Sequence, residues 1–172
     1  GIQGGTGGAG VIAADFDNDG DQDVFIAGDG NFMNPIQTTP ITLFRNNGDK
    51  TFTNVFAQSG ISMVTSLTAS AADIDNDGDL DMFISAPGSL ALQRQDHSKL
   101  YLNDGKMTFT DITEQAGITD TNLGACVSAC SDYDNDGDAD LFVTTTNGGS
   151  YLFNNQNETW IDVTEEAGIN TD

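Results

Sequence analysis

The chain has 172 residues, of which 27 are acidic and 5 are strongly basic, and its net charge is −22. This length accommodates one domain with a sizeable apolar core. The charge argues against nucleic acid and anionic membrane surfaces as partners, because both are bound through clusters of Lys and Arg. No apolar run reaches the roughly 18 residues of a membrane-spanning helix, so we expect no membrane insertion.

The acidic side chains are concentrated in three blocks of nine residues, which together hold 15 of the 27 acids. The blocks read DFDNDGDQD at 15–23, DIDNDGDLD at 73–81 and DYDNDGDAD at 132–140, and they begin 58 and 59 residues apart. Gly-Ile pairs at Gly60 and Gly117 recur in the same phase. This periodicity predicts three repeats, at residues 1–60, 61–117 and 118–172, that together form one segment.

Each repeat carries the same succession of short segments. A stretch of small and β-branched residues precedes the acidic block, and three apolar runs follow it, with turn signals such as Asn47-Gly48 before the last run. A helical turn, stopped by a left-handed glycine at Gly117 or Gly168, closes the later repeats. The predicted strands are 11–14, 24–26, 43–44 and one from 52; 68–72, 82–84, 100–102 and one from 109; and 127–131, 141–143, 151–153 and one from 160.

Four-stranded antiparallel units repeated with this period are typical of β-propeller blades, so the sequence predicts an all-β fold of three blades. The small residues of the first segment suit the crowded innermost strand. An open stack or a sandwich of repeats is the alternative. Three blades do not close a ring with ordinary blade geometry. Either the chain is a segment of a longer propeller, or two copies form a homodimer that completes a six-bladed ring.

The acidic blocks predict one calcium site in each repeat. Positions 1, 3, 5 and 9 of every block offer Asp carboxylates, position 7 offers its backbone carbonyl, and position 6 is a Gly that permits a sharp turn. Hard calcium binds six to eight oxygen ligands, which such a loop supplies. The candidate ligands are Asp15, Asp17, Asp19, Asp21 and Asp23; Asp73, Asp75, Asp77, Asp79 and Asp81; and Asp132, Asp134, Asp136, Asp138 and Asp140.

Three other interpretations of the blocks are less favourable. Magnesium prefers a smaller octahedral site that retains more waters. An EF-hand needs Glu at position 12 and flanking helices, whereas position 12 is Ile26, Ile84 or Val143 and the flanks resemble strands. Solvated acidic turns without a metal would not require the same acids and the same glycine three times.

The acidic loops on a blade-length period resemble the FG-GAP/VCBS repeats of integrin-type β-propellers. The segments FTDITEQAGI at 109–118 and WIDVTEEAGI at 160–169 resemble the ASPIC/UnbV-associated branch of these repeats. The resemblance covers nearly the whole chain. It implies that each acidic loop joins the first two strands of a blade and binds Ca²⁺, three ions per chain, and that the protein is extracellular, periplasmic or on the cell surface and serves adhesion or scaffolding.

A partner-binding surface is expected on the loops between the second and third strands of the first two repeats, at 28–41 and 87–99. Loops on a rigid scaffold commonly carry binding residues, although ordinary variable loops would look the same. Aromatic, sulfur-containing and basic side chains gather there and are the candidates for contact with a protein or glycan ligand: Phe32, Met33, Arg94, His97 and Lys99.

The sequence does not indicate an enzyme. The single histidine, His97, has no placed nucleophile, and no nucleotide-binding, zinc-protease or serine-hydrolase motif is present. Bound calcium would keep the paired carboxylates ionised rather than prepare them for acid catalysis. The leading hypothesis is a calcium-stabilised scaffold for extracellular adhesion or protein interaction. The alternatives are a glycan-binding, lectin-like propeller and an accessory domain of a larger secreted enzyme.

Overall fold

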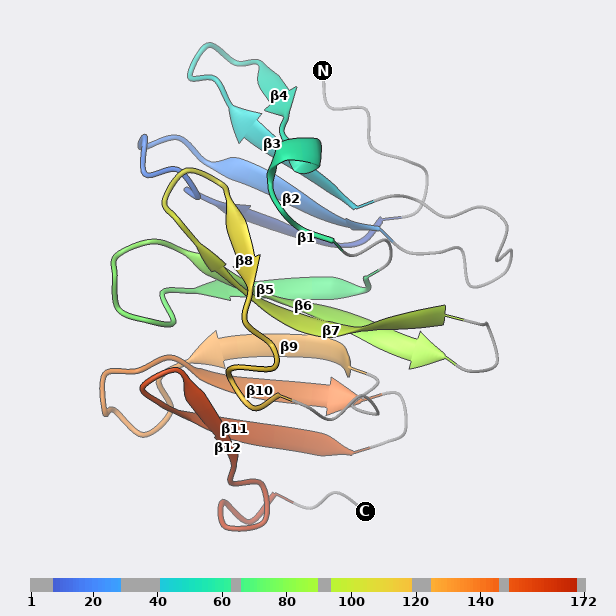
Figure 1. The fold of residues 1–172 in the computed structure, drawn as a ribbon, viewed down its shortest axis with the longest axis vertical. Helices are drawn as coiled ribbons and strands as arrows, with labels where there is room; N and C mark the ends of the chain where they lie inside the picture. Colours follow the sequence, from blue (N-terminus) through green and yellow to red (C-terminus); the bar gives the residue numbers. More distant parts are fainter. Residues whose placement is uncertain are drawn as a thin grey trace.

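The computed structural model describes residues 8–28, 41–62, 66–89, 94–118, 125–145 and 149–169. Within these ranges the chain forms three four-stranded antiparallel sheets, and in each sheet the strands neighbour one another in sequence order (Figure 1). The sheets correspond to the three predicted repeats and are called blade 1, blade 2 and blade 3. The all-β prediction is therefore confirmed.

The strands are short, and their bounds follow the predicted apolar runs. Blade 1 contains β1 (Gly8–Ala14), β2 (Asp23–Gly28), β3 (Thr42–Asn46) and β4 (Phe52–Asn54), followed by the 3-10 turn η1 (Phe56–Gln58). Blade 2 contains β5 (Thr68–Ala72), β6 (Asp81–Ser89), β7 (Arg94–Asn103) and β8 (Phe109–Asp111). Blade 3 contains β9 (Ala125–Ser131), β10 (Asp140–Thr145), β11 (Ser150–Gln156) and β12 (Thr159–Asp162).

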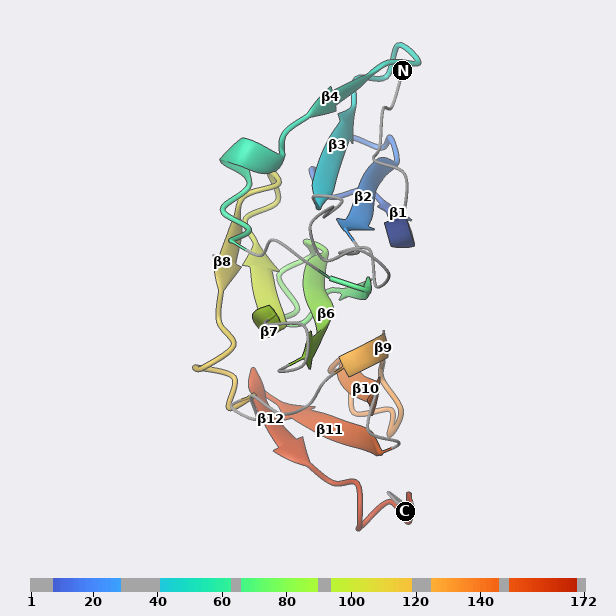
Figure 2. The ribbon, with the colours of Figure 1, turned by 90° about the vertical axis from the view of Figure 1, so that its right-hand side faces the viewer.

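The blades stack face to face along the long axis of the molecule, from blade 1 to blade 3 (Figure 1). The first strands of neighbouring blades, β1 with β5 and β5 with β9, contact each other. The fourth strands β4, β8 and β12 lie on the opposite side of the molecule (Figure 2). This arrangement, with each sheet running outward from an inner first strand, is that of propeller-type blades.

The second strand of the middle blade explains why the apolar runs are continuous rather than alternating. Met82, Phe83 and Ile84 in β6 are all fully buried, although successive side chains of a strand point to opposite faces. Met82 and Ile84 face blade 1, whereas Phe83 faces blade 3. A strand covered on both faces requires apolar residues at every position.

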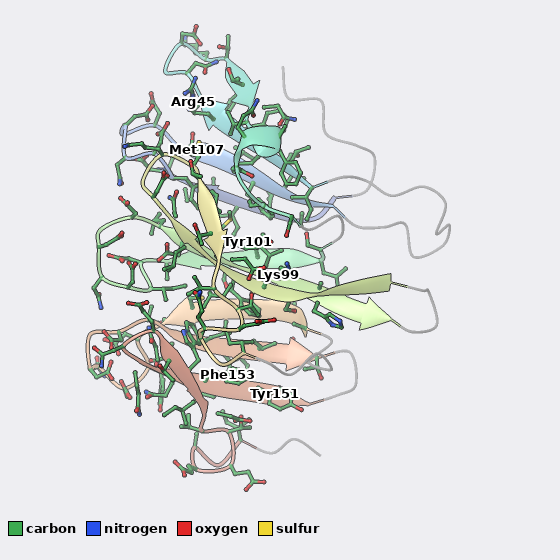
Figure 3. The ribbon with its side chains drawn as sticks, in the orientation of Figure 1. Arg45, Lys99, Tyr101, Met107, Tyr151 and Phe153 are labelled. Carbon is green, nitrogen blue, oxygen red and sulfur yellow. The ribbon has the colours of Figure 1, made fainter. Side chains whose placement is uncertain are left out.

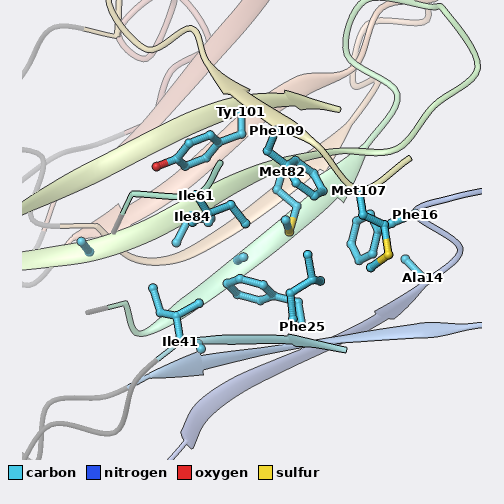
Figure 4. Close-up of a cluster of buried hydrophobic side chains, with 14 residues drawn as sticks. Ala14, Phe16, Phe25, Ile41, Ile61, Met82, Ile84, Tyr101, Met107 and Phe109 are labelled. Atoms are coloured by element: carbon cyan, nitrogen blue, oxygen red, sulfur yellow. The ribbon is translucent and has the colours of Figure 1, made fainter. Parts of the chain in front are cut away.

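The core therefore consists of two layers, one between each pair of neighbouring blades. Between blades 1 and 2, the rings of Phe16 and Phe109 meet edge to face, with centroids 5.8 Å apart and an interplanar angle of 76° (Figure 4). Phe25, Met82 and Tyr101 fill the same layer and are fully buried. Burial of such large side chains contributes about 1.5–3 kcal/mol each, so inter-blade packing is a main source of stability.

The glycine that ends each later repeat has the expected left-handed backbone. Gly117 has φ +79°, and Gly168 has φ +71°. The amide of Ile118 donates to the carbonyl of Thr113 at 3.1 Å, and the amide of Gly117 donates to the carbonyl of Glu114 at 3.2 Å. This pair of bonds is a Schellman motif, which satisfies carbonyls at the end of the single helical turn.

The predicted loop at 87–99 is largely a hairpin. Strand β6 continues to Ser89 and β7 begins at Arg94, with backbone pairing between these two residues after two irregularities in register. The hairpin projects from the edge of the blade opposite the acidic loop (Figure 1). The segment forms paired strands instead of a loop, because most backbone amide and carbonyl groups of two paired strands find hydrogen-bond partners in each other. Phe32 and Met33, in the other predicted loop, lie outside the described residues.

Candidate metal sites

Each acidic block forms the connection between the first and second strands of its blade. The three connections lie at the same edge of the stack (Figure 1), where side-chain oxygens project from the loops (Figure 3). The glycine at position 6 has φ +92° at Gly20, +96° at Gly78 and +101° at Gly137. These left-handed conformations explain why glycine recurs at the turn.

The first Asp of each block organises the loop backbone. In blade 1, the Asp15 carboxylate accepts hydrogen bonds from the amides of Asp19, at 3.1 Å, and Gly20, at 2.9 Å. Asp73 accepts from the equivalent amides at 3.1 and 3.0 Å. Asp132 does so at 3.2 and 3.1 Å. The loop is thus folded around its first carboxylate, and the same geometry is formed three times.

The last Asp of each block is buried and joins the loop to the third strand. Asp81 is 0% exposed; its carboxylate accepts from the amide of Ile74 at 2.8 Å and from that of Asn103 at 2.8 Å. Asp23 and Asp140 make the equivalent pairs of bonds and are also buried. Burial raises the pKa of Asp81 from 3.8 to about 7 despite the two amide donors. The ionised carboxylate is therefore costly there, and a nearby cation would stabilise it.

The structure brings three carboxylates together in every blade. One oxygen from each member of a group lies within 4.8 Å of the others, and the groups are Asp15, Asp17 and Asp19; Asp73, Asp75 and Asp81; and Asp132, Asp134 and Asp136. These predicted ligands come from positions 1, 3, 5 and 9. The side chains of Asp21, Asp79 and Asp138, at position 7, belong to no such group among the described residues.

The donor set fits a hard divalent cation. All the gathered ligand atoms are carboxylate oxygens, which calcium and magnesium prefer over transition metals. The Oδ1 atom of Asp17 is buried and has no hydrogen-bond donor in the described part of the chain. Burial, together with the charges of Asp19 and Asp15, raises the pKa of Asp17, and burial and Asp77 do the same for Asp75. A bound cation would remove this penalty.

The position-7 carboxylates connect neighbouring blades. The side-chain amide of Asn18 in the first block donates to the carboxylate of Asp79 in the second at 2.5 Å. The side-chain amide of Asn76 in the second block donates to the carboxylate of Asp138 in the third at 2.8 Å. Both donors have left-handed backbones, with φ 56° and 61°. This role of the asparagine was not predicted from the sequence. The available signal was Asn at position 4 of every block, since Asn tolerates that conformation better than other non-glycine residues.

A second set of asparagines also connects the blades. Asn103 at the end of β7 donates to the carbonyl of Phe16 in blade 1 at 2.8 Å. Asn155 of β11 donates to the carbonyl of Ile74 in blade 2 at 3.0 Å. The first two acidic loops are therefore each bonded to the next blade through a backbone carbonyl as well as through an Asn side chain.

The basic partner-binding candidates occupy β7. His97 is exposed, and Lys99 is half-buried beside Tyr101 (Figure 3). The Lys99 ammonium donates to Asp111 at 2.7 Å and to the hydroxyl of Ser62 at 3.2 Å. Arg94 is at the start of the strand. Lys99 therefore stabilises the contact of β7 with its neighbours, and its role toward a partner stays a prediction.

Comparison with known proteins agrees with this geometry. Residues 15–84 match the model of the FG-GAP-like repeat. This segment is an FG-GAP-like repeat. The match begins at the first acidic loop, contains the second, and ends in β6. The third acidic loop lies outside this match and has the same hydrogen bonds around Asp132 and Asp140 as the first two loops have at their equivalent residues.

The chain also resembles cartilage acidic protein 1 of Mus musculus, with 28% identity over 171 positions. The similarity covers 93% of this chain but only 26% of that relative, so the chain spans about a quarter of its length. None of the helices in the described ranges has the length and apolar character needed to cross a bilayer.

Proposed function

We propose that the protein is a calcium-binding scaffold, with one structural Ca²⁺ held by the acidic loop of each FG-GAP-like repeat. The observation that carries this proposal is the threefold gathering of carboxylate oxygens within 4.8 Å. Each pair of neighbouring carboxylates without a cation would cost about 1–4 kcal/mol, depending on the local dielectric. Calcium would offset this repulsion and fix the connection between the first two strands of a blade.

We further propose that the scaffold serves adhesion or protein interaction outside the cytoplasm and is not an enzyme. The name of the mouse relative describes an acidic protein of cartilage, and this chain is itself strongly acidic. Bound cations would hold the clustered carboxylates in their ionised form, which does not suit general-acid chemistry. A glycan-binding propeller and an accessory domain of a secreted enzyme are the other candidates; a glycan array tests the first of these.

Equilibrium dialysis with calcium tests the proposed sites. We expect three ions per chain, with dissociation constants in the range of about 10⁻⁴–10⁻³ M that is usual for extracellular modules. Asp17→Asn, Asp75→Asn and Asp134→Asn should each remove one ion. The matched control is Asp49→Asn, which removes the same charge from an exposed turn outside the clusters.

Thermal unfolding gives an independent measure. Ligand at about one hundred times its dissociation constant stabilises a protein by about 2.7 kcal/mol per site, so excess calcium should raise the melting temperature and chelator should lower it. An equal concentration of magnesium should have a smaller effect. The proposal fails if the wild type binds no calcium and its melting temperature does not respond to calcium. It also fails if Asp49→Asn reduces calcium binding as much as Asp17→Asn does.

A further inference from the structure

The inter-blade interface is built twice in this chain from equivalent positions, and its apolar part is fully closed both times. Phe16 of blade 1 and Ile74 of blade 2 follow the first Asp of their loops and are 0% and 1% exposed. Phe25 and Phe83, at equivalent positions of β2 and β6, are both 0% exposed. Each of these side chains packs in the layer toward the following blade.

The same face of blade 3 is open. Tyr133 occupies the position of Phe16 and Ile74 but is 46% exposed, and Phe142 occupies that of Phe25 and Phe83 but is 37% exposed. Val127 points to the same side, because it alternates with Ser128, which contacts blade 2. We call Val127, Tyr133 and Phe142 the trailing face.

Blade 1 exposes the other half of this interface. Val11 of β1 is 69% exposed, whereas its equivalent Ala69 in β5 is 8% exposed. Val24 and Ile26 are half-buried, whereas Met82 and Ile84 at the equivalent positions of β6 are fully buried against blade 1. Phe52 of β4 is likewise half-buried, whereas Phe109 in β8 is 3% exposed. We call Val11, Val24, Ile26 and Phe52 the leading face.

Four of the five large hydrophobic side chains that are exposed in the described part of the chain, namely Val11, Val127, Tyr133 and Phe142, belong to these two faces. Each end of the stack also presents one partner of the side-chain hydrogen bond that joins neighbouring blades. Asn135 of blade 3 is equivalent to the donors Asn18 and Asn76 and shares their left-handed backbone, with φ 63°. Asp21 of blade 1 is equivalent to their acceptors, Asp79 and Asp138.

We infer that the trailing face of one chain docks onto the leading face of a second copy, as blade 2 docks onto blade 1. Asn135 of one copy would donate to Asp21 of the other, and Tyr133 and Phe142 would pack against Val24 and Ile26. Two such joints between two copies give the six-bladed homodimer, since a head-to-tail contact closes into a ring when the rotation fits. This inference rests on the repeat scaffold of the proposed function but not on calcium binding.

The occupant is a second copy because this chain carries both complementary halves of one interface. The charges at the proposed joint agree with a second copy as the occupant. Within the chain, Met107 of blade 2 packs in the layer against blade 1, and Glu158 of blade 3 stands at the equivalent position with the same left-handed backbone. The equivalent residue of blade 1 is Lys50, which has the same left-handed backbone. At a joint between copies, the loop of blade 3 would therefore face a cation instead of a carboxylate.

Analytical ultracentrifugation of the full chain in calcium buffer tests the joint with one variant for each face. The wild type should sediment with twice the chain mass of 18.1 kDa. Phe142→Glu on the trailing face and Val11→Glu on the leading face should each weaken self-association about a hundredfold, because an unpaired charge would be buried. Thr110→Glu, on an exposed position of the middle blade, adds the same charge and should leave association unchanged.

Mixing the two variants distinguishes head-to-tail docking from contact between like faces. A Phe142→Glu chain has an intact leading face and a Val11→Glu chain has an intact trailing face, so an equimolar mixture should recover dimers through one joint. Circular dichroism checks that each variant is folded, and Val127→Glu, at a position 57% exposed, replaces Phe142→Glu if that variant unfolds.

A monomeric wild type at about 100 μM, well above the micromolar range of specific complexes, overturns the inference. In that case a further blade of a longer chain is the occupant of these faces. Dimers that persist in both variants, or a mixture that fails to recover them, overturn it as well. Calcium stoichiometry measured on the same samples separates this outcome from a failure of the proposed sites: a monomer with three ions refutes only the docking, and a metal-free dimer refutes only the calcium proposal.

Discussion

Substitution of Asn103 by alanine tests whether the bonds between blades stabilise the fold. Its side-chain amide donates to the carbonyl of Phe16 in blade 1 at 2.8 Å and to the carbonyl of Leu80 at 3.0 Å. The residue is 5% exposed, so water cannot replace these bonds. Asn103→Ala keeps the backbone amide that bonds to Asp81. Only the side-chain contribution is therefore removed.

The expected loss follows from the two bonds. A typical hydrogen bond contributes about 1 kcal/mol net, and a buried carbonyl left without a donor costs about 1–3 kcal/mol. The Oδ1 atom of Asn103 is itself buried without a donor in the described part of the chain, and its removal offsets part of the loss. We expect the free energy of unfolding to fall by about 2–3 kcal/mol, which lowers the melting temperature by about 4–12 °C for a chain of this size.

Asn46→Ala is the matched control, because Asn46 is the equivalent of Asn103 in blade 1 but makes no hydrogen bond to another blade among the described residues. Asn46 ends β3 as Asn103 ends β7, but its side chain makes only exposed bonds within the described residues: its amide donates to the carbonyl of Gln22 at 3.2 Å, and its Oδ1 accepts from the amide of Gly48 at 3.1 Å. Its loss should cost less than about 1 kcal/mol. Both variants are compared by urea unfolding at submicromolar concentration, where contacts within one chain decide the result. Equal losses for Asn46→Ala and Asn103→Ala would refute the inter-blade argument.

Two further predictions concern a glycine and a thiol. Gly60→Ala should destabilise the chain by about 1–3 kcal/mol more than Gly168→Ala. Both glycines have positive φ, but a Cβ at Gly60 would lie 2.5 Å from the carbonyl oxygen of Phe109, whereas nothing lies within 4 Å at Gly168; equal losses in chemical denaturation would contradict this. Burial raises the pKa of the Cys130 thiol from 9.0 to about 11, so the thiol is neutral at pH 8 and becomes reactive only as the pH approaches that value. In a Cys126→Ser background, alkylation at pH 8 should be about a hundredfold slower in the folded chain than in urea, and comparable rates would show that the thiol is not shielded.

The sequence predicted the strands well because their signal is local. Runs such as Met82–Ile84 are short and apolar, and the acidic blocks and glycines mark where each run begins. The left-handed stops at Gly117 and Gly168 followed from the same local reasoning, since glycine is favoured where φ is positive. The repeat strengthened every assignment, because the same element was predicted three times from different residues.

The roles of individual aspartates could be separated only in part in the sequence. Position 7 was expected to offer its backbone carbonyl, but the chemistry of carboxylate ligands applies equally to the other four aspartates of a block. In the structure, Asp15 organises its loop, Asp23 anchors that loop to β3, and Asp21 occupies the position whose equivalents accept a bond from the preceding blade. These differences depend on burial and on partners up to 62 residues away in the chain, for which the sequence carries no local signal.

The extended β6–β7 hairpin was missed for a related reason. The segment at 87–99 contains Pro87 and Gly88, which are typical of loops, and it has no apolar alternation that would indicate strands. Pairing continues there because both strands are already held by blade 2, so that backbone bonds extend a ladder rather than begin one. Tertiary context overrides weak local preference in such cases.

Each acidic loop contains candidate metal ligands and also residues at the positions of the hydrogen bonds between blades. Asn18 lies between the candidate ligands Asp17 and Asp19, and its partner Asp79 lies between Asp77 and Asp81 of the next loop. Any cation that orders the first loop therefore also positions the donor that reaches the second. The loops form a continuous connection along one edge of the stack, from Asp21 on blade 1, the equivalent of the acceptors, to Asn135 on blade 3, the equivalent of the donors. The proposed metal sites and the hydrogen bonds between blades therefore lie in the same loops, which accounts for the recurrence of the asparagine and the glycine beside the acids.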